Sequence, residues 1–471
     1  MAIAAEGFVS CCGHFRAQSE CEGSNVSPPA VKVNTVDYHL AALLLMVHGV
    51  RSAAYGRTTR LPEGLCSRMQ VDLLKQVQDL FENSYGTLNH LASVRRFFSP
   101  GRINLIGEHI DYCGGLVFPA TVQFGTVIIA QPNGLGIIRV VSINEPGKVE
   151  FDPAGALQRS TPAHWGDYVK GVFVEYGKVN VEVPGLDVAV GGDIPGGGLS
   201  SSASLEVGIA LLIETFTGYS SSDDKFANRQ ALSWLAQRAE NEFVGVNCGI
   251  MDQGAIALGK ENHAMLMDCS DLSINYYAVE LGDYSLLIVN SCKQRRLGES
   301  AYNKRCEEVA LALSILQPVF GIGALCELPV DLVNDALVCI DDPILCRRVR
   351  HVVSEHNRVS RAAIKLSSGD VEGFGKLLNE SHRSLQQDYE VTGHELDTLI
   401  GLAQQQPGVL GARMMGAGFG GCGLVLIKTS NIDQFSEVVG TAYRASIGYD
   451  AEFYPVEIGH GAKEILSTHN E

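Results

Sequence analysis

A glycine-rich stretch directly before a predicted helix could bind the phosphates of a nucleotide. Residues 195–204 read Pro-Gly-Gly-Gly-Leu-Ser-Ser-Ser-Ala-Ser. Glycines let backbone N–H groups approach a phosphate closely, the first turn of a helix adds unpaired donors, and a serine hydroxyl can reach a metal ion. The lysine of a Walker A loop is absent, and the competing interpretation is a flexible turn with a capping serine. We expect a phosphate-binding loop.

A second stretch collects polar side chains that suit a polyol. Residues 99–112 read Ser-Pro-Gly-Arg-Ile-Asn-Leu-Ile-Gly-Glu-His-Ile-Asp-Tyr, which places Arg102, Glu108, His109 and Asp111 within ten positions. The segment is otherwise too apolar for a solvated face, so these charges need partners. The partners are either one another, in a structural ion-pair network, or the hydroxyls of a sugar. In the second case a wrong epimer would leave polar groups unpaired, which gives specificity.

The third stretch, residues 416–423, reads Gly-Ala-Gly-Phe-Gly-Gly-Cys-Gly and contains Gly-x-Gly-x-x-Gly. A dinucleotide-binding fold requires a helix after this motif and an acidic residue about twenty positions later. Here Leu-Val-Leu-Ile follows at 424–427, which predicts a strand. We therefore expect a tight turn that packs against a bound ligand. The protein-kinase motifs are missing too, because His382-Arg383 is not followed by the catalytic Asp.

The three glycine-rich and polar stretches must be positioned by helices and strands, which the spacing of apolar residues predicts. Apolar spacing predicts helices over 71–81, 205–216 and 228–241, a mostly helical region over 347–405, and strands over 97–106, 116–130, 285–290 and 423–428. The serines before residue 205 suit a helix N-cap. Strands and helices mix irregularly, without βα repetition, which predicts an α+β fold.

Composition and charge bound the class of protein. The chain has 471 residues, 46% hydrophobic and 19% charged, which is an ordinary globular composition long enough for two domains. Its formal net charge is −17, so it repels phosphate backbones and we expect no nucleic-acid partner. The longest apolar run, His39 to Val50, is too short to span a bilayer, and no secretory signal is visible. We expect no membrane association.

The cysteines indicate a compartment. Thirteen of them, an odd number without a regular framework, favour reduced thiols and a cytoplasmic protein. The alternative is a peroxisome-like organelle, because Lys32-Val33 followed by His39-Leu40 loosely fits a receptor-read import address. We also expect a monomer.

Taken together, the three stretches resemble the signature motifs of the galactose, homoserine, mevalonate and phosphomevalonate (GHMP) kinase superfamily. Within it, residues 101–112 are similar to the galactokinase signature. Further blocks agree in the same order, and the similarity runs from about Val71 to the C-terminus. They are Trp-Gly-Asp-Tyr-Val-Lys-Gly (165–171), Cys-Gly-Ile-Met-Asp-Gln (248–253), and Tyr302 with Arg-Cys-Glu-Glu (305–308).

The resemblance implies a two-lobed GHMP kinase fold with its ligands in the cleft between the lobes. The N-terminal domain, expected over 71–275, would be like ribosomal S5 domain 2. The C-terminal domain, expected over 276–471, would be ferredoxin-like. Residues 1–70 would form a poorly packed N-terminal extension, since they have no counterpart in the family.

The resemblance also assigns roles residue by residue. Asp252 matches the catalytic aspartate, Arg102 matches a second catalytic position, and Trp165 matches an aromatic residue of the adenine site. Ser202 and Glu240 match the Mg²⁺ ligands. The sugar-binding positions are Arg102, Glu108, His109, Asp111, Gly249, Asp252 and Tyr302. The remaining ATP-binding positions are Gly196, Gly197, Gly198, Leu199, Ser200, Ser201 and Ser202.

The expected reaction is ATP-dependent phosphorylation of α-D-galactose at O1, giving galactose 1-phosphate and ADP. Phosphoryl transfer needs positioning and charge neutralisation more than covalent help. Asp252 would take the proton from O1, or would only orient that hydroxyl. A basic residue is common in the family where Gln294 stands here, flanked by Lys293 and Arg295, so the partner of the Asp252 charge is open.

Two other functions stay open at this point. Ile110 and Cys113 stand where many galactokinases have Thr and Asn, a variant similar to the N-acetylgalactosamine kinase branch. A galactose- and ATP-binding sensor without turnover is the alternative of another class. Such sensors lose part of a Ser-Ala pair in the phosphate loop, and this chain keeps Ser202-Ala203.

Overall fold

We describe residues 65–88, 94–293 and 298–465 of a computed structural model. The N-terminal extension up to residue 64, and with it the import-address pattern at 32–40, lies outside the described residues, as do Gln294 and Arg295. No helix within the described ranges combines the length and the apolar character that crossing a membrane requires. The nine cysteines from Cys113 to Cys422 carry free thiols.

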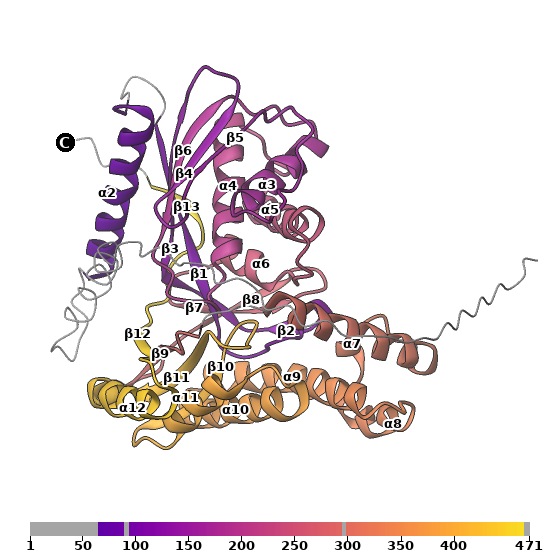
Figure 1. Cartoon of the computed structure of the whole chain (residues 1–471). Coiled ribbons are helices and arrows are strands. Elements are labelled where there is room, and N and C mark those ends of the chain that lie inside the picture. The colour runs from indigo at the N-terminus through magenta and orange to yellow at the C-terminus, as the bar shows by residue number, and fades with distance from the viewer. Residues whose placement is uncertain (1–64, 89–93, 294–297, 466–471) are drawn as a thin grey trace, which may run out of the picture. The chain divides into compact units, whose positions relative to one another are not determined.

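The first half of the described chain is built on a six-stranded sheet (Figure 1). In spatial order its strands are β13 (Lys463–Glu464), β1 (Arg95–Asn104), β3 (Pro119–Pro132), β6 (Leu186–Gly192), β4 (Ile138–Ser142) and β5 (Lys148–Phe151). Neighbours are antiparallel except β4 and β6. Because β13 pairs with β1, the end of the described chain returns to the first sheet.

Helices cover both faces of this sheet (Figure 1). On one face lies α2 (Leu65–Tyr85), and on the other lie α3 (Gly166–Lys178), α4 (Ser201–Thr217), α5 (Lys225–Arg238) and α6 (Met251–Leu258). Alternation along β3 explains the two layers, since side chains of a strand point to opposite faces in turn. Val127 and Ile129 pack in one apolar cluster with Val77 of α2, whereas Ile128 packs in another with Val207 of α4.

The second half holds a four-stranded antiparallel sheet and most of the remaining helices (Figure 1). Its order is β10 (Val409–Met414), β11 (Cys422–Lys428), β9 (Tyr284–Asn290) and β12 (Glu452–Pro455). The helices are α7 (Gly298–Phe320), α8 (Val333–Val338), α9 (Pro343–Ser367), α10 (Val371–Ser384), α11 (His394–Gln404) and α12 (Ile432–Ile447). Helices α10 and α11 pack on β10.

A third, small sheet of β2 (Leu116–Val117), β7 (His263–Asp268) and β8 (Ile274–Ala278) completes the strands named here. Two π-helical turns matter for the site. They are η2 (Ala239–Val244), which continues α5, and η5 (Leu385–Tyr389), which continues α10.

The architecture confirms the predicted α+β class. The helix predicted over 71–81 lies inside α2, the strands over 285–290 and 423–428 are β9 and β11, and the helical region over 347–405 is α9 to α11. The strand predicted over 116–130 is divided, because Leu116 and Val117 pair with β7 rather than with β1. The proposed division at residue 275 stays a prediction.

Candidate active site

One pocket of about 560 Å³ brings the three stretches together. Residues 102–111 form one wall, the glycine-rich loop a second, and the turn between β10 and β11 a third. The lining residues that the sequence predicted are Arg102, Glu108, His109, Asp111, Gly197, Gly198, Ser200, Ser201, Ser202, Glu240, Gly249, Asp252 and Tyr302. Segments more than 300 residues apart in the chain, such as those of Arg102 and Phe419, therefore share one cavity.

Asp252 and Arg102 form an ion pair at the pocket wall. Asp252 stands in the first turn of α6, and its Oδ1 lies 2.8 Å from Nε and 2.7 Å from Nη2 of Arg102. The guanidinium also donates to the carbonyl of Gly198 at 2.6 Å. Arg102 is thus the partner of the Asp252 charge that the sequence left open, and it ties Asp252 to the glycine-rich loop.

Local geometry explains how Arg102 reaches the loop. The pairing of β1 with β3 shifts register between Pro100 and Arg102, and the Arg102 N–H donates to Leu199 O at 3.0 Å instead of to the sheet. Gly101 allows this approach, because a Cβ there would lie 2.8 Å from Leu199 O. The bulge therefore joins the second stretch to the first.

The glycine-rich loop leads into α4 with a left-handed backbone at several positions. Gly196, Gly198 and Ser200 have φ of 63°, 121° and 64°. A serine does stand at the N-cap of α4, as predicted, but the Ser200 side chain forms no capping hydrogen bond and donates to the Asp252 carboxylate instead. The reason is the left-handed backbone of Ser200, since a capping residue normally has an extended one.

Two predicted loop residues do not line the pocket. The Leu199 side chain is fully buried in the apolar core, and Gly196 lies so close to Asn290 that a Cβ would be 2.6 Å from its Nδ2. Trp165, at the N-cap of α3, does not line the pocket either, although Tyr168 one turn later does. Only the backbone of Leu199 faces the site region, through its bond to Arg102.

Ser202 and Glu240 form the second polar corner of the pocket. Glu240 lies in the π-helical turn η2, is buried, and is hydrogen-bonded to the Ser202 hydroxyl. Burial and then the nearby Asp252 charge raise the pKa of the Glu240 carboxyl. Gln253 donates to Glu240 at 2.7 Å and to Glu206 at 3.1 Å.

Sequence reasoning missed Glu206 and Gln253. Glu206 is fully buried in α4, where burial and then Glu240 raise its pKa well above the usual range. An acidic residue inside an otherwise apolar helix was the available signal, because a buried carboxyl needs a partner. Gln253 gave no such signal, since its two partners lie on other elements.

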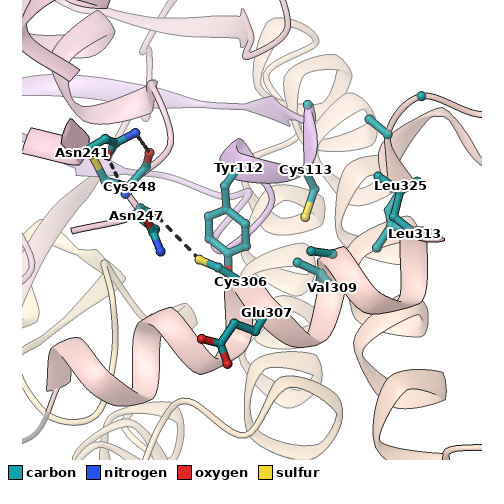
Figure 2. Close-up of a pocket in the computed structure, with 14 residues that line it drawn as sticks. Tyr112, Cys113, Asn241, Asn247, Cys248, Cys306, Glu307, Val309, Leu313 and Leu325 are labelled. Atoms are coloured by element: carbon teal, nitrogen blue, oxygen red, sulfur yellow. Dashed lines mark hydrogen bonds between the residues drawn. The ribbon is translucent and has the colours of Figure 1, made fainter. Parts of the chain in front are cut away.

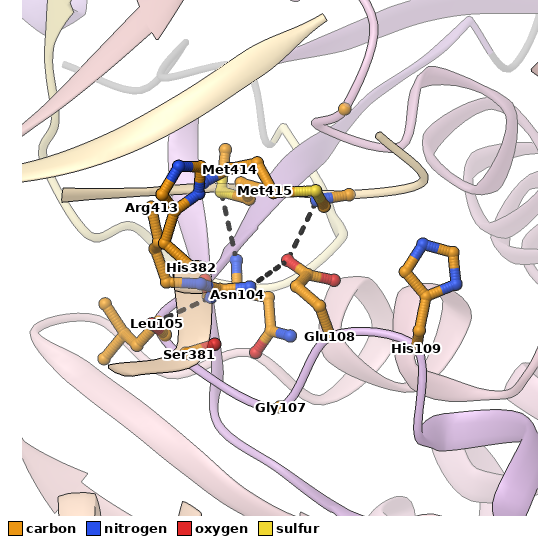
Figure 3. A network of polar contacts seen from close by, with 12 residues as sticks. Asn104, Leu105, Gly107, Glu108, His109, Ser381, His382, Arg413, Met414 and Met415 are labelled. Carbon is orange, nitrogen blue, oxygen red and sulfur yellow. Dashed lines mark hydrogen bonds and ion pairs between the residues drawn. The ribbon is translucent and has the colours of Figure 1, made fainter. Parts of the chain in front are cut away.

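Glu108, one of the predicted sugar-binding residues, is bound by residues of the second half of the molecule (Figure 3). Nη2 of Arg413, in β10, lies 3.1 Å from Glu108 Oε1, and both side chains are almost completely buried. The Gly416 N–H donates to the same carboxylate at 2.9 Å. Burial raises the pKa of Glu108, and the Arg413 charge opposes that rise.

Asp111 and Gly249 fit against each other. A Cβ at Gly249 would lie 2.1 Å from Asp111 Oδ2, so only glycine leaves room for this carboxylate. Burial, and then the charges of Asp252 and Glu108, raise the pKa of Asp111 to about 7. Four carboxylates, those of Glu108, Asp111, Glu240 and Asp252, therefore line one cavity. Two of them are paired with an arginine, Asp252 with Arg102 and Glu108 with Arg413.

Arg413, Tyr112 and Tyr389 are further residues that sequence reasoning missed. Arg413 is fully buried within the apolar strand β10 and also donates to the carbonyls of Asn104 and Leu105 (Figure 3). A lone arginine in an apolar strand was a usable signal. The tyrosines bond to each other at 2.8 Å, and Tyr112 bonds to His109 at 2.7 Å.

Comparison with protein families identifies the family and the fold of this chain. The galactokinase galactose-binding signature matches residues 79–132, the GHMP kinases N-terminal domain matches 167–260, and the GHMP kinases C-terminal model matches 361–445. A galactokinase of Enterococcus faecalis is 46% identical over 399 residues, which cover 83% of this chain and all of that protein. The chain belongs to the galactokinase family.

Other relatives agree with this membership. A galactokinase of Clostridium tetani is 44% identical over 375 residues, covering 79% of this chain and 94% of that protein. The crystal structure of Lactococcus lactis galactokinase complexed with galactose superposes with a TM-score of 0.79 at 40% identity, covering 83% of this chain and all of that one. A Methanococcus jannaschii mevalonate kinase, at 15% identity and a TM-score of 0.56, shares the GHMP kinase fold.

Proposed function

We propose that this galactokinase transfers the γ-phosphoryl group of ATP to O1 of α-D-galactose, giving galactose 1-phosphate and ADP. The observation that carries the proposal is the place of Asp252, which lies in one pocket with the glycine-rich loop and the carboxylate cluster. Phosphoryl transfer is mostly a matter of alignment and charge stabilisation, and well-aligned reactants can lower the barrier by roughly 7–11 kcal/mol.

Asp252 is proposed to accept the O1 proton as the new P–O bond forms. The Arg102 guanidinium balances its negative charge, and the Ser200 hydroxyl fixes its second oxygen. Both contacts hold the carboxylate in one orientation at the edge of the loop. The same contacts would serve an Asp252 that only orients the hydroxyl, and the two roles differ in the effect of an Asn substitution.

The sugar hydroxyls are proposed to bind the polar residues that line the pocket away from the glycine-rich loop. Glu108, Asp111 and the backbone at Gly249 are polar groups in a largely buried wall, and His109 and Tyr302 add two rings whose centroids lie 5.4 Å apart. A sugar with one inverted hydroxyl leaves such a group without a partner, so epimers bind poorly.

The loop is proposed to hold the ATP phosphates. Gly197, Gly198 and Ser201 line the pocket where α4 begins, and the first turn of a helix presents backbone N–H groups and partial positive charge to anions. Gly196 and Leu199 would shape the loop by packing, and Trp165 is proposed for the adenine side.

Mg²⁺ is the proposed cofactor, with Ser202 and Glu240 as its protein ligands. A hydroxyl and a buried carboxylate oxygen in direct contact suit a hard cation that prefers oxygen and takes its remaining ligands from phosphates and water. In the described ranges no group of three or more acidic, His or Cys side chains is arranged to hold a metal ion. When bound, the ion would neutralise charge on the phosphates.

Glu240→Gln tests the metal assignment. Loss of the anionic ligand should raise the Mg²⁺ concentration for half-maximal rate about tenfold or more. Glu242→Gln is the matched control, because this carboxylate lies on the same turn but faces solvent and pairs with Lys178. Identical Mg²⁺ titrations for wild type and Glu240→Gln would contradict the ligand role.

The reaction is tested by measuring ADP release with a panel of hexoses that includes galactose, its epimers and N-acetylgalactosamine. We expect galactose to give the highest kcat/KM. A higher kcat/KM with N-acetylgalactosamine would reassign the substrate. Absence of galactose-stimulated ADP at micromolar enzyme would instead indicate a sensor that binds both ligands without turnover.

A further inference from the structure

The His109 ring is hydrogen-bonded at both of its nitrogens. Nε2 lies 3.1 Å from the carbonyl oxygen of Ala417, in the turn between β10 and β11. Nδ1 lies 2.7 Å from the hydroxyl of Tyr112. A carbonyl can only accept, so Nε2 carries the hydrogen and donates it. Neither nitrogen is left over for a further partner.

The directions of the neighbouring bonds follow from this one. Burial, and then the nearby His351, lower the pKa of His109 to about 3, so the imidazole is neutral and has one N–H. Nδ1 must therefore accept from Tyr112, whose single hydroxyl hydrogen is then used. The Tyr389 hydroxyl, 2.8 Å away, must donate to Tyr112. In this series of hydrogen bonds Tyr389 donates to Tyr112, Tyr112 donates to His109, and His109 donates to Ala417.

Packing holds each member of this series in place. His109 has a left-handed backbone with φ of 60°, which a side chain rarely adopts unless its surroundings fix it. The Tyr389 ring lies 5.1 Å from the His109 ring and 4.4 Å from that of His351, and the Arg348 guanidinium lies over it. Tyr389 comes from the π-helical turn η5 and His109 from the segment after β1.

We propose that Tyr112 and Tyr389 are positioning residues that keep His109 in its Nε2–H tautomer. The ring then clamps the Ala417 turn over the pocket, and it is not itself a ligand of a sugar hydroxyl. Ala417 lines the same pocket as Gly416, Gly418 and Phe419, so the clamp sets the position of a whole wall. This inference rests on the proposed galactokinase function. Within that function it changes the role of the His109 ring from binding the sugar to positioning the Ala417 turn.

Tyr→Phe variants remove the hydroxyls without removing the rings. Tyr112 also lines a second pocket of about 440 Å³, together with Cys306 (Figure 2). Tyr112→Phe should lower kcat/KM for galactose about tenfold, mainly through KM, because Nδ1 loses its donor. Tyr389→Phe should lower it about threefold, since Nδ1 keeps its bond.

Deoxy sugars distinguish a His109 ring that positions the Ala417 turn from one that binds a sugar hydroxyl. We expect His109→Leu and Tyr112→Phe to lower kcat/KM by the same factor for galactose and for its 2-, 3-, 4- and 6-deoxy derivatives. His109→Gln, which keeps an N–H donor, should restore part of the loss. A loss that vanishes for one deoxy sugar would show that the ring binds that hydroxyl, and it would overturn the proposal.

A matched control and a direct measurement complete the test. Tyr176→Phe removes the hydroxyl of another buried tyrosine, bonded to Glu214 in the first half of the molecule, and should leave kcat/KM for galactose unchanged. In wild-type enzyme, ¹⁵N NMR of the imidazole should show the Nε2–H tautomer with and without galactose. A switch of tautomer or protonation on adding galactose would overturn the proposal. Failure of the galactokinase function itself would appear separately, as absent turnover in the hexose panel.

Discussion

The glycine-rich loop and the polar segment 107–111 face the same pocket but are held in different ways. The left-handed turns of the loop come from its own sequence, through glycines at positive φ and the start of α4 directly after them. The polar segment is held from far along the chain. Glu355 accepts from the Gly107 N–H across 248 positions, and the Gly416 N–H reaches Glu108 across 308. The backbone turns of the loop are thus encoded locally, although Arg102 and Met415 also contact it, whereas the contacts of the polar segment come from the second half of the chain.

The largest effect is expected where the two regions meet, at Asp252. Asp252→Asn keeps the shape and most contacts but removes the base, so kcat should fall about 10²- to 10⁴-fold while galactose binding persists. Steady-state kinetics and galactose titration check this, with the melting temperature as control for the unpaired Arg102. A nearly unchanged kcat would mean that Asp252 only orients the hydroxyl.

Arg413→Met tests the dependence of the sugar wall on the second half. It leaves Glu108 as an uncompensated buried charge, which should cost about 3–5 kcal/mol of unfolding free energy and raise the galactose KM more than the ATP KM. Arg444→Met is the matched control, because its pair with Asp450 is exposed and contributes only about 0–1 kcal/mol. Adding Glu108→Gln should recover stability without recovering galactose binding. Equal stabilities of the two arginine variants in denaturant unfolding would contradict the assignment.

Gly198→Ala tests the local region in the same way. With φ of 121° and a new Cβ 3.1 Å from Met415 O, alanine should be strained by about 1–3 kcal/mol. We expect a higher KM for ATP with a smaller change in the KM for galactose, the reverse of Arg413→Met. Gly177→Ala, at a helical position with open space around it, serves as the control. Parallel changes in both KM values would show that loop and wall are coupled.

The smallest effect concerns the pH dependence of stability. The pKa of Asp111 is raised from 3.8 to about 7, so between these values the folded protein keeps a proton that the unfolded chain has released. This carboxyl therefore lowers stability as pH rises through that window, and the penalty is complete above it. Asp111→Asn should melt about 2–4 °C higher than wild type at pH 8 and about the same at pH 4. A melting difference independent of pH would contradict the raised pKa.

The sequence predicts the site residues that lie in short, contiguous motifs. The loop, the polar string and the Asp252 block are each short, and the structure places them in one pocket. The sequence does not predict the residues that hold these motifs in position. Gln253 and Tyr389 have partners on other elements, and the role of Ser200 depends on its left-handed backbone, which no propensity rule assigns to serine.

The sequence by itself determined the family, the α+β class and the residue types available for phosphoryl transfer, because motif order and periodicity are properties of the chain alone. Only the tertiary structure decided that Arg102 balances Asp252, that Arg413 pairs with Glu108, and in which direction the bonds around His109 run. Those outcomes depend on distances of a few ångströms between segments far apart in the chain. Burial then sets which groups stay charged, and burial is a property of the packed fold rather than of any motif.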